Sequence, residues 1–244
     1  MKTALVTGAN KGIGFAVVKL LAEKGFYVYL GCRDAQRGAE AVSELNRNGL
    51  KNVEVLELDV TDQQSVDNAS NILSSKIKEL DVLINNAGIS GAYDQTALGS
   101  QIAEFERVYA TNVFGVVRVT AAFVGLLKKA SQPRIVNVST AMASLGMAGD
   151  LENLHYPKRY VIYQSSKAAL NMYTVNLAHE LLGTSFKINA VCPGYTQTDF
   201  TGGQGTSTTA QAAQRIVKYA LIGPDGPTGK YFSEEYQAEG AYPW

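Results

Sequence analysis

The sequence is poor in the residues that build disulfides, metal centres and strongly charged surfaces. Only two of its 244 residues are cysteines and two are histidines. Cys32 and Cys192 match no metal-binding or redox spacing, so we expect two small buried thiols in a reducing compartment and no metal. The 22 basic and 22 acidic residues balance. That balance argues against a basic surface for the phosphates of nucleic acid.

Long hydrophobic runs are also lacking. We identify no apolar stretch approaching the ~20 residues that cross a membrane, and no basic amphipathic anchor. Lys2 to Val6 already has the pattern of a buried strand, so no signal peptide is expected before it. We therefore expect a soluble cytoplasmic protein without membrane or nucleic-acid partners. The hydrophobic share of 46% is enough for a sizeable core.

Short β-branched runs alternate with longer amphipathic segments along the chain. This rhythm predicts an α/β fold, with a doubly wound parallel sheet of about seven strands and helices on both faces. No change in composition marks a second domain, so we expect one domain over residues 1–244. The expected strands are 4–6, 27–30, 53–58, 82–84, 134–139, 187–191 and 230–233. The expected helices are 12–24, 34–48, 61–79, 112–129, 161–182 and 208–221.

The first expected strand runs directly into a glycine-rich turn, Thr7 to Gly14. Glycines let a backbone turn tightly and approach a pyrophosphate, and the free amides of the following helix favour an anion. A glycine trio alone is weak, but this one lies between the first strand and the first helix, where the mechanism needs it. The predicted cofactor contacts in the turn are Gly8, Asn10, Lys11, Gly12, Ile13 and Gly14.

Tyr163 and Lys167 stand four residues apart in an expected helix, so they share one face. A free phenol is a poor acid near pH 7, because its pKa is ~10. A lysine charge ~4 Å away would favour the phenolate by ~4 kcal/mol at an effective dielectric of ~20, lowering the pKa by roughly 3 units. Such a phenol suits general acid–base work. Taken alone, the pair is equally compatible with a half-buried tyrosine in a helix.

The turn spacing T-G-x-x-x-G-x-G resembles the cofactor turn of the short-chain dehydrogenases/reductases, and other segments follow in that family's order. The resemblance covers residues 1 to about 233 and implies a Rossmann-type fold. It implies an adenine contact at Asp59-Val60 and a cofactor segment at Asn86-Ala87-Gly88. It implies nicotinamide-side contacts at Pro193, Gly194, Thr196 and Thr198. Finally, it implies a catalytic tetrad of Asn112, Ser139, Tyr163 and Lys167, of which Tyr163 and Lys167 also touch the cofactor.

The end of the second expected strand bears on the choice of dinucleotide. An acid there would bind a ribose 2′-hydroxyl and select NAD, but the chain has Arg33 followed by Asp34. Arg33 suits a 2′-phosphate, and Lys11 in the glycine turn can reach the same group. We therefore expect NADP(H), which agrees with a resemblance to the carbonyl reductase branch of the family. Asp34 would repel the phosphate if it faced the ribose, but we expect it to cap the second helix.

These residues predict NADPH-dependent reduction of a ketone or aldehyde. Tyr163 would donate the proton, Ser139 would bind the carbonyl oxygen, and Asn112 would link Lys167 to solvent through a water. The resemblance further implies that Lys167 holds the nicotinamide ribose. Two other functions stay open: a dedicated biosynthetic reductase such as a 3-oxoacyl reductase, or a redox sensor that binds NADP without catalysis.

Three regions are expected to set this chain apart. Residues 148–159 lengthen the gap before Tyr163, and they could line the pocket, alter an oligomer surface or form a tolerated loop. Residues 201–209 resemble the family's mobile substrate loop. The aromatic tail 234–244 is expected to pack on its own subunit or on a neighbour, since a homo-oligomer is open. The expected substrate contacts are Ala141, Met142, Leu145, Tyr156 and Tyr195.

Overall fold

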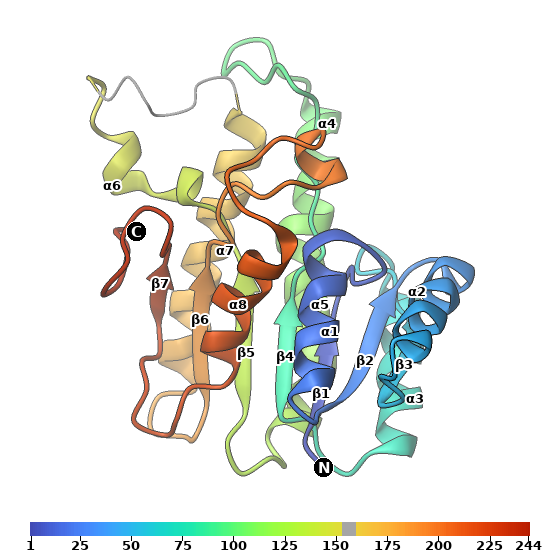
Figure 1. The fold of residues 1–244 in the computed structure, drawn as a ribbon. Coiled ribbons are helices and arrows are strands. Elements are labelled where there is room, and N and C mark those ends of the chain that lie inside the picture. Colours follow the sequence, from blue (N-terminus) through green and yellow to red (C-terminus); the bar gives the residue numbers. More distant parts are fainter. Residues whose placement is uncertain (153–159) are drawn as a thin grey trace.

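The computed structural model describes residues 1–152 and 160–244. Within them, seven parallel strands form one sheet in the order β3-β2-β1-β4-β5-β6-β7, with helices on both faces (Figure 1). This confirms the predicted fold class. The strands are β1 Thr3–Val6, β2 Tyr27–Cys32, β3 Val53–Glu57, β4 Val82–Asn85, β5 Arg134–Val138, β6 Lys187–Val191 and β7 Lys230–Phe232.

The helices match the expected segments, with additions in the middle of the chain. Asp34 and Asp62 cap α2 and α3, each accepting a backbone amide of the first turn, so the predicted capping role of Asp34 is confirmed. The α-helices are α1 Gly12–Glu23, α2 Ala35–Arg47, α3 Gln63–Lys76, α4 Ile102–Tyr109, α5 Gly115–Leu127, α6 Leu145–Ala148, α7 Val161–Glu180 and α8 Thr209–Ala220. A π-helical segment η1 spans Ala110–Phe114, and 3-10 turns η2 and η3 span Ala141–Ala143 and Asp199–Thr201.

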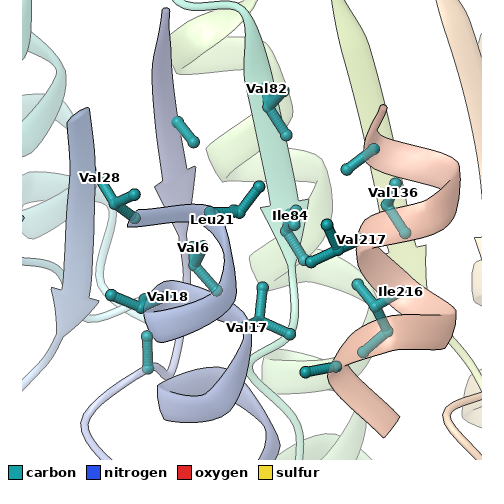
Figure 2. Close-up of a cluster of buried hydrophobic side chains, with 14 of the residues drawn as sticks. Val6, Val17, Val18, Leu21, Val28, Val82, Ile84, Val136, Ile216 and Val217 are labelled. Carbon is teal, nitrogen blue, oxygen red and sulfur yellow. The ribbon is translucent and has the colours of Figure 1, made fainter. Parts of the chain in front are cut away.

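Alternate residues of the central strands enter two separate cores, because successive side chains of a strand point to opposite faces. Val6 of β1 faces α1 and α8, and Figure 2 shows Val17, Leu21 and Ile216 converging on that side of the sheet. Leu5 faces the opposite core, which α3, α5 and α7 cover. Burial on both faces explains why the strands are almost continuously apolar.

The helix that enters the second core is longer than predicted. Ile102–Leu127 forms one helical stretch of 26 residues that is long and apolar enough to cross a membrane. The expectation that no such run exists, and the predicted helix start at Asn112, are therefore wrong. Val119, Phe123 and Leu127 are buried against the sheet. Core packing thus accounts for the apolar face of this helix.

The order of the strands reverses direction between β1 and β4. Chain connections run outward from this point, through β2 and β3 on one side and through β5 to β7 on the other. In doubly wound sheets the ligand crevice opens at the carboxyl ends of the strands at such a point. The glycine turn follows β1 and the Asn86-Ala87-Gly88 segment follows β4, so the fold brings both predicted cofactor segments to this crevice.

Candidate active site

The glycine turn packs directly against the segment that follows β4. Gly8 and Gly12 adopt left-handed backbone conformations with φ of 61° and 58°, which other residues rarely tolerate. A Cβ atom on Gly8 would lie 2.8 Å from the Cα atom of Ala87. The Asn86 Nδ2 atom donates to the carbonyl oxygens of Thr7 and Gly8, at 2.9 and 3.1 Å. The two predicted cofactor segments therefore form one tightly packed wall.

The first turn of α1 packs against the same segment after β4. A Cβ atom on Gly14 would lie 2.6 Å from the Asn86 Nδ2 atom, so the helix begins where only glycine fits. Lys11 is the N-cap residue of α1, and its side chain forms an ion pair rather than a cap. The amides of Gly12 and Ile13 belong to this first turn, where a helix has spare donors and a positive end that favour an anionic phosphate.

The loop after β6 reaches back to the glycine turn. A Cβ atom on Gly12 would lie 3.6 Å from the methyl group of Thr198. The Lys11 Nζ atom lies 2.8 Å from the Asp199 Oδ2 atom. The ammonium group holds the pKa of the Asp199 carboxyl below its usual value. Thr196 is buried in this loop, and its hydroxyl donates to the Gly194 carbonyl at 3.0 Å. The loop therefore meets the glycine turn through Thr198 and Asp199.

Two charged side chains hold the base of this loop. The Arg215 Nη1 atom donates to the Pro193 carbonyl at 2.7 Å, and the Glu235 Oε2 atom accepts the Tyr195 amide at 2.6 Å. Arg215 and Glu235 leave no room for a Cβ atom on Gly194, whose φ is 88°. The predicted nicotinamide segment is thus fixed from behind by residues that no motif identified.

Charged side chains of both signs line the surface between the glycine turn and α2, close to the end of β2. A groove of about 360 Å³ lies between the glycine turn and α2, and its lining includes Lys11 and Arg37 together with the carboxylates of Glu40 and Glu44. Arg33 is exposed just after β2. Asp34 accepts the Arg37 amide at 3.0 Å and pairs with the Arg37 guanidinium at 3.5 Å. Asp34 is therefore engaged at α2, and Arg37 is a third cation at this corner that the sequence analysis did not select.

Asp59 and Val60 have clear structural roles. The Asp59 carboxylate accepts the amide and hydroxyl of Thr61, at 2.8 and 2.7 Å. Val60 is buried, and a Cβ atom on Gly115 would lie 2.9 Å from the Val60 Cγ2 atom. These contacts shape the turn after β3 and fix it on α5. The adenine contact implied for the two residues stays a prediction.

Tyr163 lies in the first turn of α7 and is partly buried. A side-chain hydrogen bond joins it to Thr140, yet burial raises the pKa of the Tyr163 phenol well above its usual value. The expected lowering of this pKa by Lys167 is therefore not found. The reason is that helical spacing fixes the shared face but not the distance between the two polar ends, and desolvation opposes the phenolate.

Lys167 extends from α7 to the end of β5. Its Nζ atom donates to the Val138 carbonyl at 2.8 Å. Burial lowers the pKa of Lys167 to about 8. A Cβ atom on Gly88 would lie 3.4 Å both from this Nζ atom and from the Asn112 Oδ1 atom. Lys167 and Asn112 therefore converge on Gly88, a predicted cofactor contact.

Asn112 is fully buried in the π-helical segment η1. Its Oδ1 atom accepts the Ile89 amide at 2.9 Å, and its Nδ2 atom donates to the Ile89 carbonyl at 2.9 Å and to the Ser166 hydroxyl at 3.0 Å. A single π-turn in an α-helix often marks a functional position. Asn112 thus ties the long helix both to the strand-end segment after β4 and to α7.

Ser139 follows β5 and is buried. Its amide donates to the Val191 carbonyl at 2.8 Å, which fixes the backbone to β6. Its hydroxyl donates to the Asn171 Oδ1 atom at 2.7 Å. All four predicted catalytic residues therefore lie at the carboxyl end of the sheet, although Ser139 has a partner that the sequence analysis did not select.

Two further residues missed by the sequence analysis contact Tyr163. The buried Gln95 side chain accepts the Tyr163 amide at 2.9 Å, and so caps α7 from another part of the chain. The Phe200 ring lies 5.7 Å from the Tyr163 ring, centroid to centroid. Phe200 immediately precedes the predicted substrate loop 201–209. Its apolar side chain beside that loop was the one feature of the sequence that could have identified it as a contact of Tyr163.

The predicted substrate contacts are only partly brought together. Ala141 and Met142 begin the 3-10 turn that follows Thr140, whereas the Leu145 side chain is exposed. The hydroxyl of the exposed Tyr195 donates to the Gln204 side chain at 3.1 Å. Tyr156 lies outside the described residues.

The aromatic tail packs on its own chain, one of the two predicted alternatives. The Trp244 ring stacks on Tyr231 at 5.6 Å, and the Tyr242 ring meets Tyr231 edge-on at 5.4 Å. The Trp244 carbonyl accepts the Gly146 amide at 2.8 Å. The Tyr231 hydroxyl in turn donates to the Thr140 carbonyl. The tail thus supports the segment that follows Ser139, beside the candidate site.

Comparison with known proteins agrees with this geometry. The family model described as short chain dehydrogenase matches residues 2–208. The chain therefore belongs to the short-chain dehydrogenase family. In residues 1–152 and 160–244, no group of three or more His, Cys, Asp or Glu side chains could hold a metal ion.

Particular relatives match over nearly their whole length. The chain is 36% identical to (-)-isopiperitenone reductase of Mentha piperita, covering 95% of this chain and 96% of that protein. It is 31% identical to salutaridine reductase of Papaver bracteatum, with 95% and 94% covered. The solved structure of NADPH-bound carbonyl reductase from chicken fatty liver has a TM-score of 0.85 at 28% identity, covering 100% of this chain and 99% of that one.

Proposed function

We propose that this protein reduces the carbonyl group of small ketones or aldehydes with NADPH. The observation that carries the proposal is the meeting of Lys167, Asn112 and Gly88 at the strand-order reversal, with Tyr163 one helical turn away. The named relatives include several reductases, and a structural neighbour holds NADPH. The protein is an oxidoreductase, and its cofactor is NADP(H).

The residues of this chain fit the cofactor at each end. The glycine turn and the start of α1 would hold the pyrophosphate. Lys11, Arg33 and Arg37 would surround the 2′-phosphate, for which guanidinium groups are suited. Pro193 and its neighbours would border the nicotinamide. When bound, NADPH supplies the hydride, and it becomes NADP⁺ as the carbonyl carbon is reduced.

Tyr163 completes the reaction by giving its phenolic proton to the substrate oxygen, so that the carbonyl becomes an alcohol. The high pKa of Tyr163 keeps that proton in place until an alkoxide develops. Ser139 binds the same oxygen and stabilises its growing negative charge. Lys167, whose Nζ atom lies beside Gly88, would contact the cofactor, and it returns a proton to Tyr163 by way of Asn112 and solvent.

The substrate class follows from the surroundings of Tyr163. The Phe200 ring offers apolar surface beside the phenol, which favours an aryl or alkyl ketone over a charged one. A carrier-linked 3-oxoacyl substrate and a non-catalytic redox sensor are the competing functions. We further propose a single domain acting in the cytoplasm; a homo-oligomer stays open.

A substrate panel tests the proposed function. Purified protein is given NADPH or NADH with cyclic ketones, aryl ketones, aldehydes, quinones and 3-oxoacyl thioesters, and oxidation of the cofactor is followed at 340 nm. We expect turnover of apolar ketones with a clear preference for NADPH. Turnover confined to thioesters would replace the proposal with the biosynthetic reductase. Tight NADPH binding without any turnover would support the sensor instead.

A further inference from the structure

Asn171 lies on the same face of α7 as Tyr163 and Lys167, one turn further along at the same four-residue spacing. It is 4% exposed and therefore sealed in the core. The side chain points to the end of β5, where its Oδ1 atom lies 2.7 Å from the Ser139 Oγ atom. Asn171 is thus the immediate neighbour of the group that would bind the substrate oxygen.

The Asn171 carboxamide is only half satisfied. Within the described residues its Nδ2 atom has no hydrogen-bond partner, although it is buried. A buried donor without a partner loses its hydration and gains nothing in exchange, so such groups are rare and call for an explanation. An apolar side chain would avoid this loss at the position. The carboxamide therefore has a reason to be there other than packing.

The chemistry of the hydroxyl supplies that reason. Ser139 has one proton, and the Asn171 Oδ1 atom accepts it in this structure. A serine in that state has no proton left for a substrate oxygen. A half-turn of the carboxamide exchanges its two polar atoms, which gives the Nδ2 atom a partner in the Ser139 oxygen. The hydroxyl proton is then free to point into the site.

We propose that Asn171 is a positioning residue whose amide donates to Ser139, so that the Ser139 hydroxyl can donate to the substrate oxygen. The proposal rests on the role assigned to Ser139 in the proposed function. It explains why the partner is a carboxamide: asparagine can donate to the serine and can also accept from it. Aspartate in its ionised form could only accept, and leucine could do neither.

The next turn of α7 shows what a purely structural bond looks like. The Asn137 Nδ2 atom donates to the Thr174 hydroxyl at 2.9 Å, and that hydroxyl donates to the Leu170 carbonyl at 2.8 Å. Thr174 is buried, as Asn171 is. Unlike the Asn171 carboxamide, the Thr174 hydroxyl has both a donor and an acceptor as partners. Thr174→Val is therefore a matched control for the loss of a buried polar bond in α7.

The test compares kcat, KM and the NADPH dissociation constant of Asn171→Asp, Asn171→Leu and Thr174→Val across pH. We expect Asn171→Asp to lose about 100-fold in kcat once its carboxyl ionises, and to recover at lower pH, where the protonated acid can donate. Asn171→Leu should lose about 10-fold at every pH, because Ser139 keeps its proton but not its orientation. NADPH binding should stay unchanged, and Thr174→Val should keep its kcat.

A double-mutant cycle guards against a variant that folds poorly. In a Ser139→Ala background, Asn171→Leu should cost nothing further in kcat, because its effect passes through Ser139. Additive losses, or an Asn171→Asp rate that follows wild-type pH dependence, would overturn the proposal. If Ser139→Ala itself retains full kcat while wild type reduces ketones, the role assigned to Ser139 fails instead. An inactive wild type would mean that the proposed function fails.

Discussion

The Phe200 ring lies 5.7 Å from the Tyr163 ring, at an interplanar angle of 57°. The residue before it, Asp199, pairs with Lys11 at 2.8 Å. The short 3-10 turn η3 therefore makes two contacts: Phe200 packs against Tyr163, the proposed proton donor, and Asp199 pairs with Lys11 of the glycine turn. In the proposed function, access of the substrate and binding of the cofactor phosphate would therefore depend on two adjacent side chains.

Replacing Phe200 should weaken binding of the substrate more than it slows the reaction step. Phe200→Ala removes an aromatic surface worth about 1 kcal/mol beside Tyr163, so KM for an apolar ketone should rise about 5-fold while kcat changes little. Steady-state kinetics with a cyclic ketone measure this. Leu182→Ala, which trims an exposed side chain beyond the end of α7, is the control. An unchanged or lower KM for Phe200→Ala would show that the ring does not bind substrate.

Removing the charge of Asp199 should strengthen binding of NADPH. Lys11 shares its charge with Asp199 in an exposed ion pair, so Asp199→Asn should lower the NADPH dissociation constant about 2- to 5-fold. NADH lacks the 2′-phosphate and should gain nothing. Titration calorimetry measures both. Asp225→Asn, in the loop between α8 and β7, controls for net charge. The same gain in a Lys11→Ala background would contradict the assignment of Lys11.

Lys167 should make stability depend on pH. Its pKa is about 8 in the folded chain against 10.5 for an ordinary lysine, so between these values the unfolded state binds more protons and stability rises with pH. Lys167→Met should therefore be more stable than wild type by up to about 3 kcal/mol at pH 7, a gain that disappears near pH 10.

Urea unfolding at pH 7 and pH 10 measures this difference. The exposed Lys128→Met variant accounts for the loss of one positive charge. An advantage of Lys167→Met that is equal at both pH values would mean that packing, and not the buried charge, sets the cost.

The tail should contribute to stability. Trp244→Ala removes a ring stacked on Tyr231 and should cost about 1–2 kcal/mol, or roughly 3–6 °C in Tm. Differential scanning calorimetry measures the shift. Tyr236→Ala, an exposed aromatic of the same tail, should shift Tm by less. An unchanged Tm for Trp244→Ala would leave the tail without a role in the fold.

Local patterns predicted much of the fold. The expected strand 187–191 coincides with β6, since its apolar run is short and clearly bounded. Segment 102–109 was missed as a helix because it mixes apolar and charged residues after a loop, and its helical form depends on its continuation into α5. The glycine turn and the tetrad were found because their spacing is local or follows the order of the strands.

The contacts across the site could not be predicted in this way. Gln95 stands 68 residues before Tyr163 and Asn171 stands 32 residues after Ser139, and no spacing rule joins such pairs. The prediction that the pKa of Tyr163 is lowered was wrong for a related reason. Helical spacing placed Lys167 on the right face, but its ammonium group donates to the Val138 carbonyl, and burial is the largest influence on the pKa of Tyr163.

The Tyr163→Phe variant tests the central claim most directly. The phenyl ring keeps the packing against Phe200 but has no proton to give. We expect kcat for ketone reduction to fall by about 1,000-fold or more, while the NADPH dissociation constant stays within about 3-fold of wild type because the glycine turn is untouched. A kcat within about 10-fold of wild type, with NADPH still bound, would contradict the assignment of Tyr163 as the proton donor.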